Sequence, residues 1–290
     1  MTIDSKILGM TTIIECKSKT YNYVSQGTGF FYAELEKEDP KKVDTTAPRW
    51  RKIEGVWLIT NRHVVFPKVK QADGSTIETI PDVFMFAMRE VRNGKVEWVP
   101  IELSRDELLK RTKLHPDASI DVAAIKVDDL QVQIVRDNPD KKFVGGMQLT
   151  SDNLPSAHQP SIEATSDIVV CSYPYGFYDR VNKFPIIKSG IIASCWSANF
   201  NGSPHFLIDA KLFHGSSGGL VISKPLDLAV INGNVMTSKD KQYTFLGIYS
   251  GEYTHPNPDG TEESFGLGIV WYSYLVPEII NKGVSQVANK

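Results

Sequence analysis

The sequence predicts an all-β protein, a barrel or a sandwich, on three observations. Short apolar segments rich in β-branched and aromatic residues recur along the chain, and turns with glycine or proline separate them at short intervals. Only residues 104–111 and 273–281 have the spacing of a helix. The chain has 290 residues, 41% of them hydrophobic, which is enough for one large or two small domains.

In the first half we expect strands over residues 11–16, 26–32, 56–60, 83–90, 96–102 and 122–127. The turn between the fourth and fifth of these strands falls on Asn93-Gly94, a dipeptide typical of tight hairpins. Ser104 and Glu107 have the spacing of a capping box, which predicts that a short helix starts there. The polar segments 34–54 and 67–81 read as surface insertions that could carry partner or regulatory contacts.

In the second half we expect strands over residues 168–171, 186–194, 206–210, 220–222, 245–251 and 265–271. Between the halves, residues 128–167 are polar and contain proline, so the best domain boundary lies there. We place an N-terminal domain at 1–145 and a C-terminal domain at 146–290, the latter ending in a helix. Residues 224–242 read as a polar connection.

Charge and cysteine content limit the functional classes. The net charge of −2 gives no strong attraction for nucleic acid or for an anionic membrane. Three cysteines cannot all pair, and the apolar surroundings of Cys171 and Cys195 predict buried free thiols and a reducing compartment. No apolar leader and no spanning segment of ~18 apolar residues is visible. We therefore expect a cytoplasmic protein with neither membrane nor nucleic-acid partners.

Residues 213–220 read Phe-His-Gly-Ser-Ser-Gly-Gly-Leu and carry the strongest candidate for chemistry. Taken alone, such a stretch is a flexible turn. Apolar strands flank it on both sides, so we expect a positioned turn. Ser217 is then a candidate nucleophile, and the backbone N–H groups of Gly215 and Ser217 are candidates to bind the oxyanion of a carbonyl under attack.

A serine nucleophile needs a base, and His63 is the best candidate among the six histidines. It follows the apolar strand 56–60, and a strand end is a rigid platform for a catalytic side chain. A lone histidine there is more often structural or solvated, so an orienting acid is required. Asp121 opens an apolar strand, although a simple turn cap would look the same. The order His63, Asp121, Ser217 is one known chain order of such a triad.

Seven short motifs, spread over nearly the whole chain, make it resemble a trypsin-like (chymotrypsin-fold) serine peptidase, closest to the HtrA/Deg branch. They span residues 27–30, 58–64, 121–125, 173–176, 190–194, 208–210 and 215–219. The resemblance implies two six-stranded antiparallel β-barrels with the active site in the cleft between them. It implies His63 as general base, Asp121 as the acid that orients it, and Ser217 as nucleophile. It also implies a polypeptide substrate and neither cofactor nor metal.

Three features depart from the family. Ser216 stands where zymogen-activated trypsins carry an aspartate and HtrA-like members an asparagine, so activation by a freed N-terminus is not expected. The chain ends soon after the second barrel, so we expect no PDZ domain. Three cysteines cannot supply the several disulfides of the trypsin branch.

The resemblance places the specificity pocket between the segment before Ser217 and the last strands. The predicted substrate-binding residues are Lys211, His214, Tyr249, Ser250, Gly251 and Gly266. A lysine at position 211 argues against basic substrate residues by like-charge repulsion and favours an acidic one if its ammonium reaches the pocket. An outward orientation of Lys211 is the equal alternative.

The leading hypothesis is a cytoplasmic serine endopeptidase that works through an acyl-enzyme. A latent form, which a protein activator would switch on by ordering the oxyanion turn, is a middle case. The alternative is a catalytically silent pseudo-protease that binds peptides or proteins. A lipase-type hydrolase is disfavoured by the order of the triad, and metal catalysis by the absence of a closely spaced ligand set.

Overall fold

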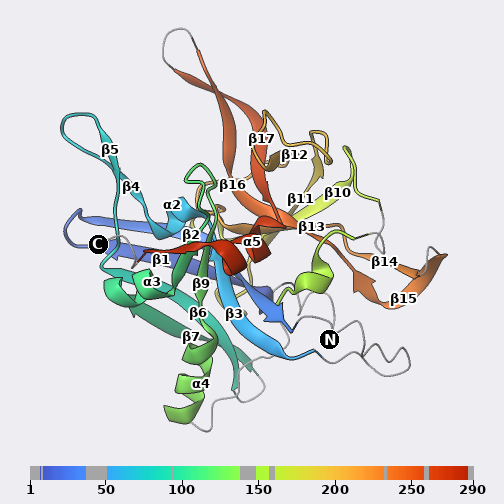
Figure 1. Cartoon of the computed structure of the whole chain (residues 1–290), viewed down its shortest axis with the longest axis horizontal. Helices are drawn as coiled ribbons and strands as arrows, with labels where there is room; N and C mark the ends of the chain where they lie inside the picture. Colours follow the sequence, from blue (N-terminus) through green and yellow to red (C-terminus); the bar gives the residue numbers. More distant parts are fainter. Residues whose placement is uncertain are drawn as a thin grey trace.

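The computed structural model describes residues 7, 9–36, 51–92, 95–137, 148–156, 161–231, 234–257 and 261–286 (Figure 1). Strands predominate, which confirms the all-β class, and a short helix near the C-terminus, α5 (Leu275–Lys282), confirms the predicted one. The predicted boundary between residues 145 and 146 lies outside the described residues and stays a prediction. No helix in these ranges is long and apolar enough to cross a membrane.

Seven strands that precede residue 127 form one antiparallel sheet together with β18 from the end of the chain. Its order is β18-β8-β9-β3-β2-β1-β6-β7. The bounds are β1 (Thr11–Ser18), β2 (Tyr23–Leu35), β3 (Ile53–Thr60), β6 (Val83–Arg92), β7 (Lys95–Ser104), β8 (Thr112–Leu114), β9 (Ala123–Lys126) and β18 (Val284–Ser285). The two strands beyond the six expected, β8 and β18, are very short, and β18 brings the end of the chain back to this sheet.

The second half forms a closed six-stranded barrel, as predicted. Its order is β10-β11-β12-β17-β16-β13. The bounds are β10 (Asp167–Ser172), β11 (Ile186–Ile192), β12 (His205–Asp209), β13 (Gly219–Ser223), β16 (Phe245–Pro256) and β17 (Glu262–Tyr272). Closure pairs the edge strands with each other, so the barrel gives the elements around Ser217 a rigid frame.

Short helices and two hairpins lie outside the two main sheets (Figure 1). The helices are α2 (Arg62–Val65), α3 (Arg105–Arg111) and α4 (Asp128–Asp137), with the 3-10 turns η1 (Ser151–Asn153) and η2 (Pro174–Gly176). The hairpins are β4 (Lys68–Lys70) with β5 (Thr76–Glu78), and β14 (Leu226–Ile231) with β15 (Asn234–Gln242). The capping box of Ser104 and Glu107 is confirmed.

Three segments read as irregular from composition hold regular structure instead. Residues 67–81 contain the β4–β5 hairpin, residues 224–242 contain β14–β15, and α4 occupies the start of 128–167. The strands β4 and β5 have three residues each and show no period. In α4, Leu130 and Ile134 lie four residues apart and pack on the core of the first half, a spacing that was overlooked within a polar segment. Of the segment 34–54, only its two ends lie in the described residues.

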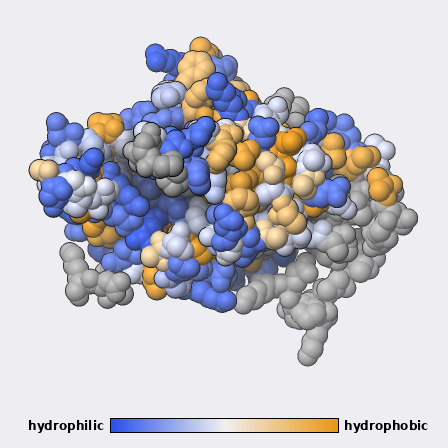
Figure 2. Space-filling view, turned by 90° about the horizontal axis from the view of Figure 1, so that it is seen from above, coloured by the Kyte–Doolittle hydropathy of each residue, from blue (hydrophilic) through white to orange (hydrophobic). Residues whose placement is uncertain are grey.

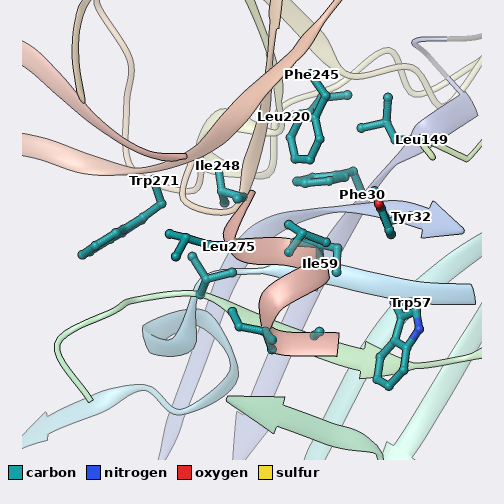
Figure 3. Close-up of a cluster of buried hydrophobic side chains, with 14 of the residues drawn as sticks. Phe30, Tyr32, Trp57, Ile59, Leu149, Leu220, Phe245, Ile248, Trp271 and Leu275 are labelled. Atoms are coloured by element: carbon teal, nitrogen blue, oxygen red, sulfur yellow. The ribbon is translucent and has the colours of Figure 1, made fainter. Parts of the chain in front are cut away.

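A hydrophobic cluster joins the two halves (Figure 3). Phe30 of β2 lies beside Leu220 and Phe245 of the barrel, and the rings of Phe30 and Phe245 meet edge to face with centroids 5.3 Å apart. Leu275 of α5 packs into the same cluster, while each half also has its own core. Such buried aromatic pairs add about 0.5–1.5 kcal/mol to the burial of their area. The cluster therefore fixes the position of His63 relative to Ser217.

The cysteines only partly follow prediction. Cys16 and Cys171 are buried and free, and burial raises the pKa of each thiol to about 12. Cys195 is free but exposed, so the expectation of a buried thiol was wrong there. It lies just after β11, where the chain has already left the barrel wall. A hydrogen bond with Ser197 lowers the pKa of its thiol.

Candidate active site

His63 lies just beyond the end of β3, as the sequence predicted. After Thr60 the chain turns at Asn61 into α2, a single helical turn whose Val64 and Val65 are buried. These two apolar anchors hold the turn against the first sheet, so the His63 ring, with its side chain 38% exposed, stands on a rigid base.

Both carboxylate oxygens of Asp121 contact His63. The Oδ2 atom lies 2.6 Å from His63 Nδ1, and Oδ1 accepts the backbone N–H of His63 at 2.9 Å. Asp121 precedes the buried Val122 and β9, as the sequence suggested. Because Nδ1 faces the carboxylate, Nε2 is left as the nitrogen available to take a proton.

Two further side chains hold Asp121 in place. Asn61, fully buried, donates from Nδ2 to the backbone carbonyl of Asp121 at 2.7 Å. Ser250 donates from Oγ to Asp121 Oδ2 at 2.6 Å. The sequence singled out Ser250 only as a substrate-binding residue and assigned Asn61 no role. The signal in the sequence that could have revealed Asn61 is its place in the motif 58–64, two residues before His63.

The turn that carries Ser217 depends on glycine. Gly215 and Gly218 have φ angles of +87° and +82°, a region that favours glycine. A Cβ on Gly218 would lie 1.9 Å from the carbonyl oxygen of Thr28, and one on Gly215 would lie 2.9 Å from the carbonyl oxygen of Tyr173. The turn therefore packs directly against neighbouring backbone and is not a free loop.

Hydrogen bonds from outside the barrel fix this turn. Thr28 of β2 donates its N–H to Ser217 O at 2.8 Å and its Oγ1 hydrogen to Gly215 O at 2.9 Å. From η2, the N–H of Tyr175 donates to His214 O at 2.7 Å. The carbonyl of His214 consequently points toward η2. Thr28 is another functional residue that the sequence did not reveal, although it stands in the quoted motif 27–30.

Backbone amides in the turn fall into two groups. The N–H groups of Ser216, Gly218 and Gly219 donate to Phe213 O, Tyr249 O and Ser216 O at 3.0, 2.8 and 2.9 Å. Within the described part of the chain, the N–H groups of Gly215 and Ser217 have no acceptor. These are the two amides that the sequence analysis assigned to an oxyanion.

The hydroxyl of Ser217 is hydrogen-bonded to the backbone in this structure. Its Oγ donates to the backbone carbonyl of Ser250 at 2.9 Å, and among the described residues it makes no hydrogen bond with His63. Ser250 thus contacts both Ser217, through its carbonyl, and Asp121, through its hydroxyl. The hydroxyl proton is donated to Ser250 O, so it must leave that carbonyl before it can pass to Nε2.

The remaining predicted substrate-binding residues differ in their surroundings. Tyr249 is only 5% exposed, its ring packs where a Cβ on Gly268 would be, and burial raises its pKa to about 12. Gly251 and Gly266 have open space around their Cα atoms. Lys211 and His214 are exposed. The Nζ atom of Lys211 lies 5.9 Å from the centroid of the Phe213 ring.

Among the residues that the structure describes, no group of three or more His, Cys, Asp or Glu side chains is arranged to hold a metal ion. The site instead combines an oriented imidazole, a serine hydroxyl and two free amides. This set can remove a proton from the serine and stabilise negative charge next to it.

Several solved structures are similar to this chain. Similar solved structures include the Rv3671c protease from M. tuberculosis in its active form, with 17% identity, coverage of 96% of this chain and 82% of that chain, and a TM-score of 0.45. Tobacco etch virus protease complexed with product has 10% identity, 98% and 84% coverage, and a TM-score of 0.47. Protease Anisep from Arthrobacter nicotinovorans has 13% identity, 95% coverage of both chains, and a TM-score of 0.44.

No curated protein matches the sequence. The model of the trypsin-like peptidase domain, however, matches residues 27–227, which include His63, Asp121 and Ser217. This match covers more than half of the chain, and the chain therefore belongs to the family of trypsin-like peptidase domains.

Proposed function

We propose that the protein is a serine endopeptidase in which Ser217 is the nucleophile, His63 the general base and Asp121 the residue that orients it. The observation that carries the proposal is the pair of free amides, Gly215 N–H and Ser217 N–H, beside a serine hydroxyl. Every other amide between positions 216 and 219 is engaged, so these two are available for an oxyanion.

The chemistry follows from these positions. Ser217 Oγ attacks the carbonyl carbon of a peptide bond while its proton passes to His63 Nε2. The carbonyl oxygen becomes negative and is bound by the two amides. His63 then gives the proton to the leaving amine, and the C–N bond breaks to leave an acyl-enzyme. Water, with its proton taken by the same nitrogen, hydrolyses the ester and restores Ser217.

A latent state is the second candidate, and one observation favours it. Ser217 Oγ is bonded to the carbonyl of Ser250 instead of His63. A protein activator would act by releasing this bond. Three statements remain predictions from the sequence: the likeness to the HtrA/Deg branch, the cytoplasmic location and the protein activator. The alternative function, a catalytically silent pseudo-protease, is tested by the following experiment.

The test is intact mass after treatment with a fluorophosphonate, which reacts with activated serines. We expect a single adduct on the wild-type protein and none on Ser217→Ala. Ser216→Ala is the matched control, because it removes the neighbouring hydroxyl and leaves the nucleophile. Removal of the base in His63→Ala should slow labelling by roughly 10³-fold or more.

Two results would contradict the proposal. An adduct that persists on Ser217→Ala would place the reactive group elsewhere. No adduct on a folded wild-type protein would mean that Ser217 is not activated in the isolated chain. Labelling that appears only after a partner is added would assign the protein to the latent case.

A further inference from the structure

Aromatic and basic side chains, all exposed except the half-buried Lys188, adjoin the nucleophile turn. We define the aromatic–lysine patch as Tyr175, Lys188, Lys211, Phe213 and His214. Tyr175 is 69% exposed and Phe213 40% exposed, which is unusual for rings of this size. The ring of Tyr175 lies 6.0 Å from that of Phe213 and 6.3 Å from that of His214, between centroids.

The patch lies in the part of the chain that exposes more of its large hydrophobic side chains. Most of the large exposed hydrophobic side chains in the described residues come after position 170. Figure 2 shows hydrophobic side chains gathered on its right half, on the side where Figure 1 places β10, β11, β14 and β15. A surface of this kind, rimmed by polar groups, is typical of a site that binds another polypeptide.

Two ammonium groups converge on Phe213. The Nζ atoms of Lys188 and Lys211 lie 4.9 and 5.9 Å from the centroid of its ring. Within the described part of the chain, neither lysine has a carboxylate within ion-pair distance, whereas Lys224 and Lys241 each pair with an aspartate at 2.9 Å. A cation over an exposed ring is held weakly, so both charges stay available for a ligand.

The patch is continuous with the turn that carries Ser217. The N–H of Tyr175 donates to His214 O at 2.7 Å, and His214 directly precedes Gly215, whose amide is free. A substrate side chain bound on the patch would therefore belong to a residue only a few positions away from the peptide bond that lies at Ser217. The rings offer apolar contact and the two lysines offer positive charge.

We propose that the aromatic–lysine patch binds an acidic side chain of a polypeptide substrate, together with an apolar residue next to it. The choice of a polypeptide rests on the proposed function; the choice of an acidic residue rests on the two unpaired ammonium groups. The carboxylate lies between Lys188 and Lys211, and the apolar neighbour packs on Phe213 and Tyr175. Charge complementarity of this kind selects partners more than it raises affinity.

The test measures binding without cleavage, in the Ser217→Ala background. The probe is a fluorescein-labelled eight-residue peptide with two glutamates flanking a phenylalanine, compared by anisotropy with a twin that has glutamines. The glutamate peptide should bind at least about fivefold more tightly, the effect of two modest surface ion pairs. Lys188→Glu combined with Lys211→Glu should abolish or reverse this preference. Phe213→Ala should weaken both peptides.

The matched control reverses two exposed lysines of the first half, Lys70→Glu with Lys110→Glu, for the same change in net charge. It should keep the preference for glutamate. The milder pair Lys188→Gln with Lys211→Gln repeats the test if the charge reversal disturbs folding. Equal binding of the two peptides to the parent, or a preference that survives in both patch variants, would overturn the proposal.

This outcome is separable from the proposed function. A wild-type protein without a fluorophosphonate adduct would refute the peptidase assignment, yet the ratio of peptide affinities would still report on the patch. Conversely, normal labelling with equal affinities would refute the patch alone.

Discussion

The two parts of the candidate site are held in contrasting ways. His63 and Asp121 come from neighbouring segments of the first sheet, and their bonds at 2.6 and 2.9 Å join them directly. The Ser217 turn takes its key hydrogen bonds from the other half of the molecule, through the backbone and hydroxyl of Thr28. The direct bonds between the base and its acid are thus made within the first half, with one further hydrogen bond to Asp121 from Ser250 of the barrel, whereas the nucleophile turn depends on how the two halves dock.

The largest expected effect concerns the local part. Asp121→Asn keeps the size of the side chain but favours the wrong tautomer of His63, so we expect the rate of fluorophosphonate labelling to fall by roughly 10⁴-fold. The control is Asp117→Asn, four residues earlier, which changes an exposed turn aspartate bonded to Ser119. Equal losses in both variants would show that the His63–Asp121 bond has no special role.

The next effect concerns docking. Gly218→Ala would place a Cβ 1.9 Å from Thr28 O at a φ of +82°, so we expect labelling to disappear and thermal unfolding to occur at a lower temperature. Gly74→Ala is the matched control, because Gly74 has a φ of +84° with no atom in reach. Its free energy of unfolding should fall by only the roughly 1–2 kcal/mol that the unfavourable backbone angle costs, and its rate of labelling should stay unchanged. Full labelling of Gly218→Ala would show that the nucleophile turn does not depend on its close contact with Thr28.

A smaller effect is expected where the two parts meet. Asn61 contacts both, because its Nδ2 donates to Asp121 O and its Oδ1 accepts the N–H of Gly218. Asn61→Ala removes the side-chain donor to Asp121 O and one of the two acceptors of the Gly218 N–H, at a cost of about 1–3 kcal/mol. Labelling should slow by about 10- to 100-fold, measured beside the free energy of unfolding. Slower labelling with an unchanged free energy of unfolding would contradict a role of Asn61 in joining the two parts. A lower free energy of unfolding with unchanged labelling would contradict a role in positioning Asp121.

The candidate residues of the site were easier to find in the sequence than the contacts that join its two parts. His63 and Asp121 follow or open apolar strands, and a strand pattern is visible within a few residues. The glycine turn at Ser217 was equally visible. Thr28 and Asn61 act across 187 and 157 residues of chain, and such pairings leave no local pattern. The short strands β8 and β18 were missed because two or three residues carry no period.

The smallest effect concerns packing and not chemistry. Cys195 is exposed with a lowered thiol pKa, whereas burial raises the pKa of Cys16 and Cys171 to about 12. Only a thiolate is alkylated readily, so native protein should take up one iodoacetamide group and denatured protein three. Intact mass gives the count, and Cys195→Ser should take up none when native. Rapid native alkylation of Cys16 or Cys171 would mean that the cores open more easily than their burial indicates.

The central claim is that the free amides of Gly215 and Ser217 receive the negative oxygen of the reacting group. A crystal structure of the fluorophosphonate adduct tests it most directly. We expect the phosphoryl oxygen at about 2.7–3.1 Å from both nitrogens, with the His214 carbonyl still hydrogen-bonded to the N–H of Tyr175. An adduct whose oxygen points elsewhere, or a turn in which the His214 carbonyl fills that place, would contradict it.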